Sequence, residues 1–232
     1  MTLLETNGLS ACYGDFQALF GIDFEVDEGE TVAVLGANGA GKSTFLNVIA
    51  GNVPVAKEQL QFDGVPMGGA RACEMVARGV TLVPEGRRLF SSLTVEENLM
   101  MGAYGGAKGY WTLDKVYALF PKLKERRKQP ATQMSGGEQQ MAAIGRGLMA
   151  NPRLLMCDEL SLGLAPIIIA EIYETLATVR DRGLTLIIVE QNVQQAMKFA
   201  QRAYCFLEGR VSLHGASSEL TREQVAKAYF GV

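Results

Sequence analysis

Histidine is nearly absent from this chain of 232 residues, with His214 as its single example. A site that holds a metal through several histidines is therefore excluded. Cysteine is scarce as well: Cys12, Cys73, Cys157 and Cys205 lie far apart and form no Cys-x-x-Cys pair. This spacing favours reduced packing residues of a cytosolic protein over a disulfide framework or a zinc site.

Neither sign of charge dominates, because 22 basic side chains face 25 acidic ones and the net charge is −3. Electrostatics therefore give no support for nucleic acid as a partner. Long apolar runs are also missing: the longest, at 161–170, is about half of the roughly 20 residues that a membrane span needs. Residues 1–14 show no signal-peptide pattern, so we expect any role at a membrane to pass through a partner protein.

The apolar patterning indicates strands that alternate with helices around a parallel sheet, in one domain with a subdomain or two. Strands are predicted at 3–13, 20–26, 31–35, 60–62, 80–83, 154–159, 184–189, 203–207 and 210–213. Helices are predicted at 42–51, 71–78, 113–128, 136–150, 166–181, 193–202 and 222–230, with a further one after Thr94. In such a sheet, a ligand binds at the carboxyl ends of the strands.

Residues 30–51 (ETVAVLGANGAGKSTFLNVIAG) combine a strand, a glycine-rich loop and a helix. Gly36-x4-Gly41-Lys42-Ser43 is the P-loop pattern in the context that it requires. Glycines let backbone N–H groups curl around a polyphosphate, at which the helix directs its positive end. Lys42 suits the β- and γ-phosphates, and the Ser43 hydroxyl suits Mg²⁺. A glycine-rich turn with an incidental Lys-Ser pair is the alternative; strand, spacing and helix together favour binding of a nucleoside triphosphate.

A second anion site is predicted where Ser135-Gly136-Gly137-Glu138 opens a helix. Ser135 and Glu138 form a capping box. Gly136 and Gly137 nevertheless occupy the first turn, where each costs roughly 1 kcal/mol against alanine. We interpret this cost as a sign that the first-turn N–H groups are kept uncovered, since such groups at a helix start bind anions.

Two adjacent carboxylates, Asp158 and Glu159, end an apolar strand. They would be costly there unless they meet a cation or a reacting group. Asp158 suits a partner of Mg²⁺ or of Mg²⁺-bound water, and Glu159 suits a residue that polarises the attacking water. A solvated strand end is the alternative, and the P-loop upstream favours the catalytic interpretation.

Two features leave alternatives open at this level. Tyr13 ends the first strand before a turn, and by itself it suggests a half-buried strand aromatic, with stacking on adenine as the alternative. The run KLKERRK at 122–128 lies in the predicted helix at 113–128. It is more simply a solvated helix face than a patch for phosphate or lipid.

The motifs together resemble those of an ABC-transporter nucleotide-binding subunit, and the resemblance covers essentially the whole chain. The motifs are the P-loop, MSGGEQQ at 134–140, the Asp158-Glu159 strand end and SLGLAP at 161–166. Finer features are similar to the smaller ATP-binding subunit of bacterial high-affinity branched-chain amino-acid transporters. These are VPEGRRLF at 83–90, LTVEENL at 93–99, LFPKLKERRKQ at 119–129 and VEQN at 189–192.

The resemblance implies an α/β P-loop NTPase fold in a single ABC ATPase domain, 1–232. A RecA-like core with an N-terminal antiparallel β subdomain would comprise 1–85 and 151–232, and a helical subdomain would comprise 86–150. It also implies roles for the motif residues. The base would stack on Tyr13, and the phosphates would be held by Gly36, Asn38, Gly39, Ala40, Gly41, Lys42, Ser43 and Thr44.

Further roles follow from the same resemblance. Mg²⁺ would be held by Ser43 and Asp158, with Glu85 at the position of the usual Q-loop glutamine. Hydrolysis would depend on Glu159 and Lys42, with Gln191 in place of the usual switch histidine. Ser135, Gly136 and Gly137 would contact the γ-phosphate of ATP on a second subunit, and Gly163 and Leu164 would lie in the D-loop that faces it.

The chain departs from the wider family at four positions. Leu160 stands where a proline is usual, and it lacks the fixed φ of that residue, which predicts a looser D-loop. Met134 replaces the first leucine of the signature, while Glu85 and Gln191 are changes that the branched-chain subfamily shares. Gln191 cannot titrate, so hydrolysis would depend on Glu159 alone.

The implied partners are a second ABC ATPase subunit in a head-to-tail homo- or heterodimer, and two membrane permease subunits that dock on 86–133. A periplasmic or extracellular solute-binding protein would act indirectly, with no nucleic acid involved. The chain would lie peripherally at the cytoplasmic face of the inner (cell) membrane and use ATP to drive import. Alternatives are an importer of urea, short amides or other amino acids, and a weakly hydrolysing regulatory module, against which Glu159 argues. A DNA-repair or translation ATPase is disfavoured, because the chain has one P-loop, one signature and a short insert.

Overall fold

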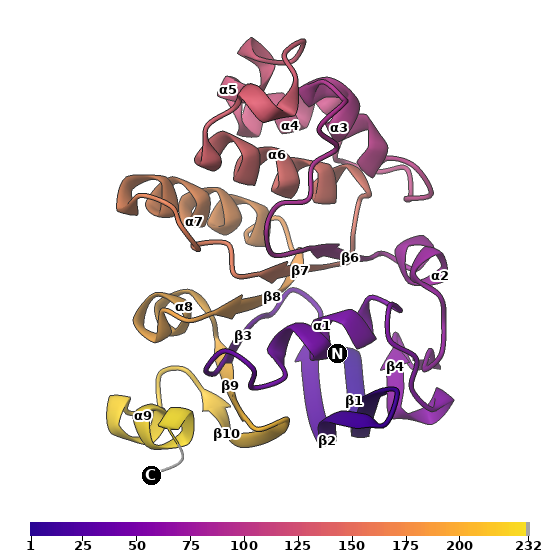
Figure 1. The fold of residues 1–232 in the computed structure, drawn as a ribbon, viewed down its shortest axis with the longest axis vertical. Coiled ribbons are helices and arrows are strands. Elements are labelled where there is room, and N and C mark those ends of the chain that lie inside the picture. The colour runs from indigo at the N-terminus through magenta and orange to yellow at the C-terminus, as the bar shows by residue number, and fades with distance from the viewer. Residues whose placement is uncertain (231–232) are drawn as a thin grey trace.

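The computed structural model describes residues 1–230, whose strands form two sheets (Figure 1). One is antiparallel, in the order β2-β1-β4-β5. Its strands are β1 (Thr2–Tyr13), β2 (Phe16–Asp27), β4 (Leu60–Phe62) and β5 (Val65–Pro66). The other has the order β10-β9-β3-β8-β7-β6, parallel except for β10. Its strands are β3 (Thr31–Leu35), β6 (Val80–Val83), β7 (Leu154–Asp158), β8 (Thr185–Glu190), β9 (Arg202–Leu207) and β10 (Arg210–Ala216).

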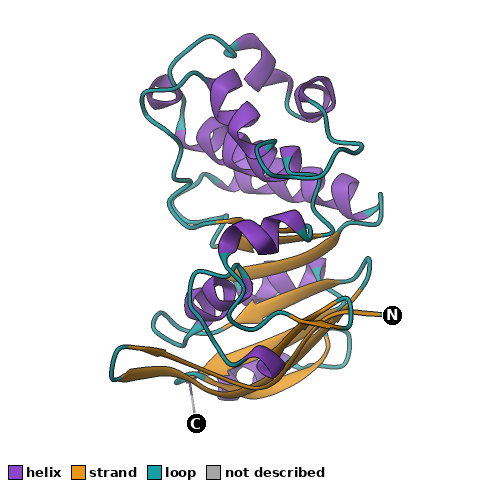
Figure 2. Ribbon diagram, turned by 90° about the vertical axis from the view of Figure 1, so that its right-hand side faces the viewer, coloured by secondary structure: helices purple, strands orange, loops and turns teal. Residues whose placement is uncertain are grey.

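The helices gather mainly in an upper lobe and along the mixed sheet. We call the upper group, α3 to α6, the helical lobe; Figures 1 and 2 show it above the strands. It contains α3 (Val95–Gly102), α4 (Leu113–Leu119), α5 (Pro121–Glu125) and α6 (Gly136–Met149). The others are α1 (Lys42–Ile49), α2 (Ala72–Ala77), α7 (Pro166–Arg180), α8 (Val193–Phe199) and α9 (Arg222–Phe230), with 3₁₀ turns at Lys57–Gln59 and Ala131–Gln133.

The central strands β3, β7 and β8 of the mixed sheet are buried on both faces, which explains why they are largely apolar, whereas the edge strand β10 is partly exposed. Alternate side chains enter two separate cores. Those of Ala33, Leu35, Cys157 and Ile188 pack with the helical lobe, α7 and α8. Those of Val32, Val34, Met156 and Val189 pack with α1 and the antiparallel sheet. Each fully buried aliphatic side chain contributes about 1.5–3 kcal/mol to the free energy of unfolding. The layers on both faces of the sheet therefore contribute to its stability.

The prediction of one basic helix at 113–128 is wrong. The chain breaks between α4 and α5 at Phe120, whose backbone is not helical (φ −127, ψ 78). The following residue is Pro121, and the ring of a proline crowds a preceding residue in helical conformation. The helix predicted at 193–202 is shorter in the structure, because α8 ends at Phe199. Arg202 already begins β9, and its Nε forms an ion pair with Glu30 Oε1 at 2.6 Å.

The segment that follows β6 is fixed to the helical lobe. Gly86, Arg87 and Arg88 all have left-handed backbone conformations, with φ of 74, 65 and 43. The guanidinium of Arg146, on α6, donates to the carbonyl oxygens of Arg87 and Arg88 at 3.1 and 2.8 Å. Asn98, fully buried on α3, accepts from the N–H of Phe90 at 2.8 Å. These hydrogen bonds hold residues 86–90 in an unfavourable backbone conformation and attach the segment to α3 and α6.

Candidate functional site

The P-loop lies between β3 and α1, with Gly41 as N-cap of the helix at φ 100. A Cβ at Gly36 would lie 2.4 Å from the carbonyl oxygen of Phe206, and one at Gly41 would lie 2.8 Å from Leu19 Cδ2. Gly39 has open space around it but a φ of 82. Glycine is therefore required for close approach at 36 and 41, and for backbone conformation at 39.

A hairpin turn that sequence reasoning did not connect with this loop supports it from behind. The N–H of Gly209, between β9 and β10, donates to the carbonyl oxygen of Ala40 at 3.0 Å. The carbonyl oxygen of Gly209 in turn accepts from the N–H of Phe20 at 2.9 Å. A Cβ at Gly209 would lie 2.3 Å from the carbonyl oxygen of Ala18. The turn at Gly209 therefore connects the P-loop, through Ala40, to β2, through Phe20.

Lys42 is 4 % exposed and points along the loop. Its ammonium donates to the carbonyl oxygens of Gly36 at 2.8 Å and Ala37 at 3.0 Å, and it lies 3.7 Å from Glu159 Oε1. Burial lowers the pKa of Lys42, and the attraction of Glu159 and Asp158 opposes this effect only in part. A buried ammonium whose carboxylate neighbours offset its desolvation only in part favours the approach of another anion.

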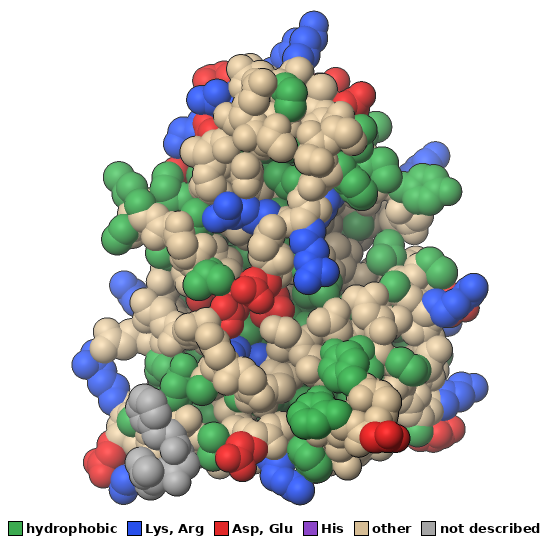
Figure 3. Space-filling model, in the orientation of Figure 1, with side chains coloured by type: hydrophobic (Ala, Val, Ile, Leu, Met, Phe, Trp, Pro, Cys, Tyr) green, Lys and Arg blue, Asp and Glu red, His purple; other side chains and the backbone are tan. Residues whose placement is uncertain are grey.

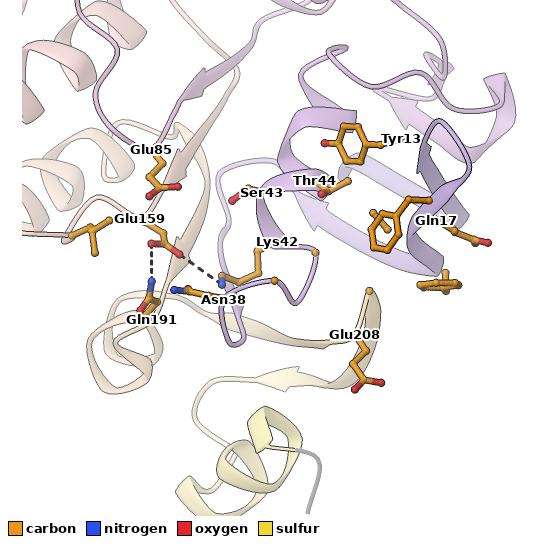
Figure 4. A pocket seen from close by; sticks show the side chains of 17 residues that line it. Tyr13, Gln17, Asn38, Lys42, Ser43, Thr44, Glu85, Glu159, Gln191 and Glu208 are labelled. Carbon is orange, nitrogen blue, oxygen red and sulfur yellow. Dashed lines mark hydrogen bonds and ion pairs between the residues drawn. The ribbon is translucent and has the colours of Figure 1, made fainter.

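Glu159 stands at the end of β7 with a left-handed backbone, φ 48. Its N–H donates to the carbonyl oxygen of Val189 at 2.9 Å, and its Oε2 accepts from Gln191 Nε2 at 2.7 Å (Figure 4). The parallel register places Asp158 opposite Val189, so the ends of β7 and β8 are neighbours. The carboxylate is therefore held from one side by Gln191 and from the other by Lys42.

Asp158 has the features of a cation ligand. It is 5 % exposed, and its Oδ1 atom has no hydrogen-bond partner within residues 1–230. Burial raises the pKa of Asp158, while a hydrogen bond from the Ser43 hydroxyl lowers it less. A buried carboxylate oxygen without a partner is costly unless a cation meets it. Ser43 and Asp158 therefore fit Mg²⁺, whose preferred ligands are such oxygens.

A cavity of about 720 Å³ joins most of the predicted residues (Figure 4). From the predicted set it is lined by Tyr13, Asn38, Gly39, Gly41, Lys42, Ser43, Thr44, Glu85, Glu159 and Gln191. Gly36 and Ala40 form the back of the loop, and Asp158 lines an adjoining cavity of about 310 Å³ together with Ser43 and Glu85. In the space-filling view, acidic side chains gather in the middle of this face (Figure 3).

Aromatic side chains form the far wall of the cavity. Tyr13 ends β1 and is 50 % exposed, which fits the half-buried strand aromatic of the simpler interpretation, and it also lines the cavity, where a base could stack on it. Phe16, which sequence reasoning missed, lines the same cavity and pairs with Tyr13 across the hairpin turn. Its signal was an aromatic residue on either side of a two-residue turn. Glu208 and Gly209 also line the cavity, but nothing local in the sequence indicates that long-range contact.

The predicted second site lies apart from this cavity, which none of Ser135, Gly136 and Gly137 lines. The capping box is confirmed: the N–H of Ser135 donates to Glu138 at 2.8 Å, and that of Glu138 donates to Ser135 Oγ at 3.3 Å. A Cβ at Gly137 would lie 2.6 Å from Ile168 Cγ2, and one at Gly136 would lie 3.2 Å from Arg87. Close packing is therefore a second reason for glycine at 137.

Two absences bound the site. Among residues 1–230, no group of three His, Cys, Asp or Glu side chains is placed to hold a metal ion. Over the same residues, no helix has the length and apolar character for crossing a membrane.

Comparison with known proteins gives a consistent result. Residues 19–161 match the family model described as ABC transporter. The chain is 47% identical over 232 residues to the high-affinity branched-chain amino acid transport ATP-binding protein BraG of Pseudomonas aeruginosa, covering 99% of this chain and 100% of that protein. It is 34% identical to the probable branched-chain amino acid transport ATP-binding protein LivF of Archaeoglobus fulgidus, covering 99% of both.

Solved structures show the same architecture. The ATP-binding cassette MJ1267 of an ABC transporter superposes with a TM-score of 0.86 at 25% identity, covering 99% of both chains. Its ADP conformation gives a TM-score of 0.84 and covers 100% of both chains. The predicted α/β fold, with an antiparallel β layer beside a P-loop core, is thereby confirmed.

Proposed function

The chain belongs to the ABC transporter family, and from this premise we propose that it hydrolyses ATP to drive a membrane importer for branched-chain amino acids. The full-length similarity to BraG, at 47% identity, supports the choice of solute. No residue of the site described above selects an amino acid. The solute assignment therefore depends on the similarity, whereas the hydrolytic assignment can be argued from the site.

One observation carries the hydrolytic part: Lys42 and Glu159 lie side by side in the cavity lining, with 3.7 Å between Nζ and Oε1. A cation for the phosphates and a carboxylate for the attacking water are the two groups that phosphoryl transfer to water needs side by side. Gln191 donates its amide N–H to Glu159, so it orients the carboxylate without exchanging protons. Glu159 is left as the proton acceptor.

Binding uses the rest of the cavity. The base stacks against Tyr13 and Phe16, and the phosphates lie against the N–H groups of loop 36–41 and the start of α1. Asn38 and Thr44, which also line the cavity, supply further polar contacts. Mg²⁺, when bound at Ser43 and Asp158, supplies charge neutralisation of the phosphate oxygens. Glu85 faces the same pair of residues from the end of β6.

The signature residues act on a second subunit in this proposal. Ser135, Gly136 and Gly137 lie outside the cavity of their own chain, so they cannot cover a phosphate bound there. A head-to-tail arrangement would bring the start of α6 from one subunit over the P-loop of another, as a homodimer or a heterodimer. ATP would then hold the two subunits together, and hydrolysis would release them.

Permease subunits dock on the helical lobe in this proposal, which places the chain at the cytoplasmic face of the membrane. Large apolar side chains are exposed there: Phe90 by 47%, Met101 by 45% and Tyr104 by 86%. They surround a hollow of about 350 Å³ that also involves Leu82 of the core. Exposed apolar side chains around a concavity are typical of a protein-binding surface. A solute-binding protein outside the membrane would act through the permeases.

The test is hydrolysis by the complex assembled with its permeases. Glu159→Gln is expected to lower kcat by about 10²–10⁴-fold, because the proton acceptor is lost. ATP binding should persist, since Lys42 and the loop are untouched. Glu174→Gln, the same chemical change at an exposed position on α7, is the matched control and should behave as the wild type.

Two results would contradict the proposal. If an intact complex does not hydrolyse ATP, a regulatory module is the better description of the protein. Gln191 and Leu160 are the residues that suggest this alternative. Uptake of radiolabelled leucine by vesicles that contain the complex tests the solute. Uptake of urea or short amides in place of leucine would redirect the assignment while keeping the ATPase.

A further inference from the structure

A buried carboxylate that the proposed hydrolysis does not use lies directly behind Glu159. Glu190, the last residue of β8, is 1 % exposed. Burial raises its pKa, and the groups that face it are Ser161, Tyr173, Cys157 and Glu159. The Tyr173 hydroxyl is buried beside it without a well-aligned hydrogen bond within residues 1–230. A buried acid is costly, so its position calls for a structural or functional reason.

The contacts of Glu190 concentrate on one residue of the neighbouring loop. Its Oε1 accepts from the N–H of Ser161 at 3.2 Å, and its Oε2 accepts from the Ser161 hydroxyl at 2.5 Å. Each carboxylate oxygen thus holds a different group of the same residue. The two hydrogen bonds together fix both the backbone and the side chain of Ser161.

The same strand end holds the backbone of Glu159. Its N–H donates to the carbonyl oxygen of Val189, the residue before Glu190. The loop that begins at Glu159 is therefore attached to the end of β8 at two points. The first is the N–H of Glu159, and the second is Ser161, two residues later. Its φ of 48 is a conformation that a non-glycine residue adopts only where its surroundings impose it. The two attachments supply that constraint.

The loop beyond Ser161 is also closed by two turn hydrogen bonds, from the N–H of Leu162 to the carbonyl oxygen of Glu159 at 3.3 Å and from that of Leu164 to the carbonyl oxygen of Ser161 at 3.2 Å. Leu160 is buried at 1% exposure, but it lacks the ring that would restrict φ. Leu162 is 51% exposed and lines the nucleotide cavity. The looser loop predicted from Leu160 is thus countered in the structure by the grip on Ser161. This grip is what keeps residues 159 to 162 in register with Gln191, which follows Glu190 directly.

We propose that Glu190 is a positioning residue for ATP hydrolysis: its carboxylate grips Ser161 and so fixes the backbone of Glu159 and the exposed loop that follows. The inference rests on the proposed function. It assigns Glu190 no contact with ATP. It predicts that the grip governs the rate of the chemical step and leaves nucleotide affinity alone, because the P-loop and Tyr13 are held by other elements.

The experiment measures kcat and KM for ATP with the complete complex for Ser161→Ala, Glu190→Gln and the double variant. Each single variant is expected to lower kcat by about tenfold with KM changed less than about twofold, since a hydrogen bond that fixes Ser161 is lost. The double variant should be no worse than about the poorer single one, because both changes remove the same grip. Ser161→Thr keeps the hydroxyl and should restore kcat.

Two measurements separate positioning from a general loss of structure. ATP bound per chain, measured with a fluorescent analogue, should equal the wild-type value in every variant. Tyr173→Phe removes a hydroxyl beside the same carboxylate but leaves Ser161 untouched, and should keep the wild-type kcat. Should Glu190→Gln fail to fold, Ser161→Ala and Ser161→Thr alone decide the matter.

The outcomes distinguish this inference from the proposed function. A wild-type complex that does not hydrolyse ATP defeats the proposed function. A wild-type complex that hydrolyses ATP while both single variants match its kcat defeats only the role of Glu190. Additive losses in the double variant, or KM rising in step with the fall in kcat, would also overturn the positioning role.

Discussion

The two helix starts that the sequence marks for anions differ in how well their polar groups are satisfied. At the start of α1, Lys42 is buried near the carboxylates of Glu159, Asp158 and Glu85, and Asp158 Oδ1 has no partner within residues 1–230. At the start of α6, Ser135 and Glu138 cap each other, and Arg126 pairs with Glu138 at 2.6 Å. The first site is incomplete because a buried carboxylate oxygen lacks a partner among the described residues, whereas at the second the capping side chains are paired with one another.

This difference indicates two ways of using one element. The incomplete site gains most from a ligand that brings both negative charge and a cation, as a metal-bound polyphosphate does. The start of α6, whose capping side chains are paired, needs no ligand for its stability, so it is suited to a ligand that is bound to another molecule. Under the proposed function, such a chain would bind nucleotide by itself and complete the site only when a second subunit associates.

The largest expected effect breaks the first site. Lys42→Ala should lower ATP hydrolysis by about 10²–10³-fold, because the buried cation that faces the phosphates is lost. Nucleotide binding by the isolated chain should weaken as well, which titration calorimetry can measure. Lys57→Ala, at an exposed lysine outside the cavity, is the control. Undiminished binding in Lys42→Ala would show that the cavity is not the nucleotide site.

A change at the second site should leave binding by the isolated chain intact. Gly137→Ala brings a methyl group 2.6 Å from Ile168 Cγ2 and should cost about 1–3 kcal/mol of unfolding free energy. Ile168→Ala in the same chain makes room and should recover most of that loss in urea titrations. Without recovery, packing would not be the reason for glycine at 137.

Gly136→Ala provides the complementary test. Its methyl group would lie 3.2 Å from the guanidinium of Arg87, the far end of a long side chain that donates to Gln139 Oε1 at 3.3 Å. If the guanidinium shifts by a few tenths of an ångström, stability should hold or rise by about 0.5–1 kcal/mol with the better helix propensity. A fall in the hydrolysis of the assembled complex would then report on the anion site itself. Unchanged hydrolysis would argue that the uncovered N–H groups are unimportant.

Asp158→Asn should stabilise the nucleotide-free chain by about 1 kcal/mol at pH 7. Burial raises the pKa of Asp158 and outweighs the attraction of Lys42, so the folded state disfavours the charged carboxylate. The wild-type carboxyl contributes most to stability below its unfolded pKa, and this contribution is lost as pH rises through the raised folded-state pKa. The advantage of asparagine, measured by urea unfolding, should therefore disappear near the ordinary pKa of about 3.9. An equal advantage at both pH values would exclude the charge as its cause.

The smallest effect concerns the aromatic wall. Tyr13→Leu should raise KM for ATP about threefold without changing kcat, because one stacking face is lost while the phosphate contacts remain. Phe16→Leu tests whether the second ring shares the role, and the double variant should lose more than either single one. An unchanged KM in all three would return Tyr13 to the status of an exposed strand residue.

Much of the fold could be predicted because its signals are local. The apolar strands and the caps at Thr94 and Ser135 lie within one turn or one strand of their partners, and the structure confirms them. The error at 113–128 had a local signal too, since Pro121 follows Phe120, but the continuous basic and apolar pattern outweighed it. Periodicity alone does not detect a break that is set by one residue.

The site was predictable where chain neighbours form it and obscure where distant segments meet. The loop at 36–44 and the Asp158-Glu159 pair could be read directly, because their chemistry follows from adjacent residues. The contact of Gly209 with Ala40 and the grip of Glu190 on Ser161 join segments that only the folded sheet brings together. No periodicity or local motif carries such pairings.

The strand order has a consequence for biosynthesis. β3, which leads into the P-loop, has β8 on one side and β9 on the other, and both come from the last part of the chain. A ribosome completes the whole loop early, by residue 44, yet its strand gains neighbours only after residues 185–207 have emerged. Until then, the apolar strand β3 that leads into the P-loop lacks both of its neighbours in the sheet, and such exposed strands are prone to aggregate. The cavity around the P-loop can therefore form only when synthesis of the chain is nearly complete.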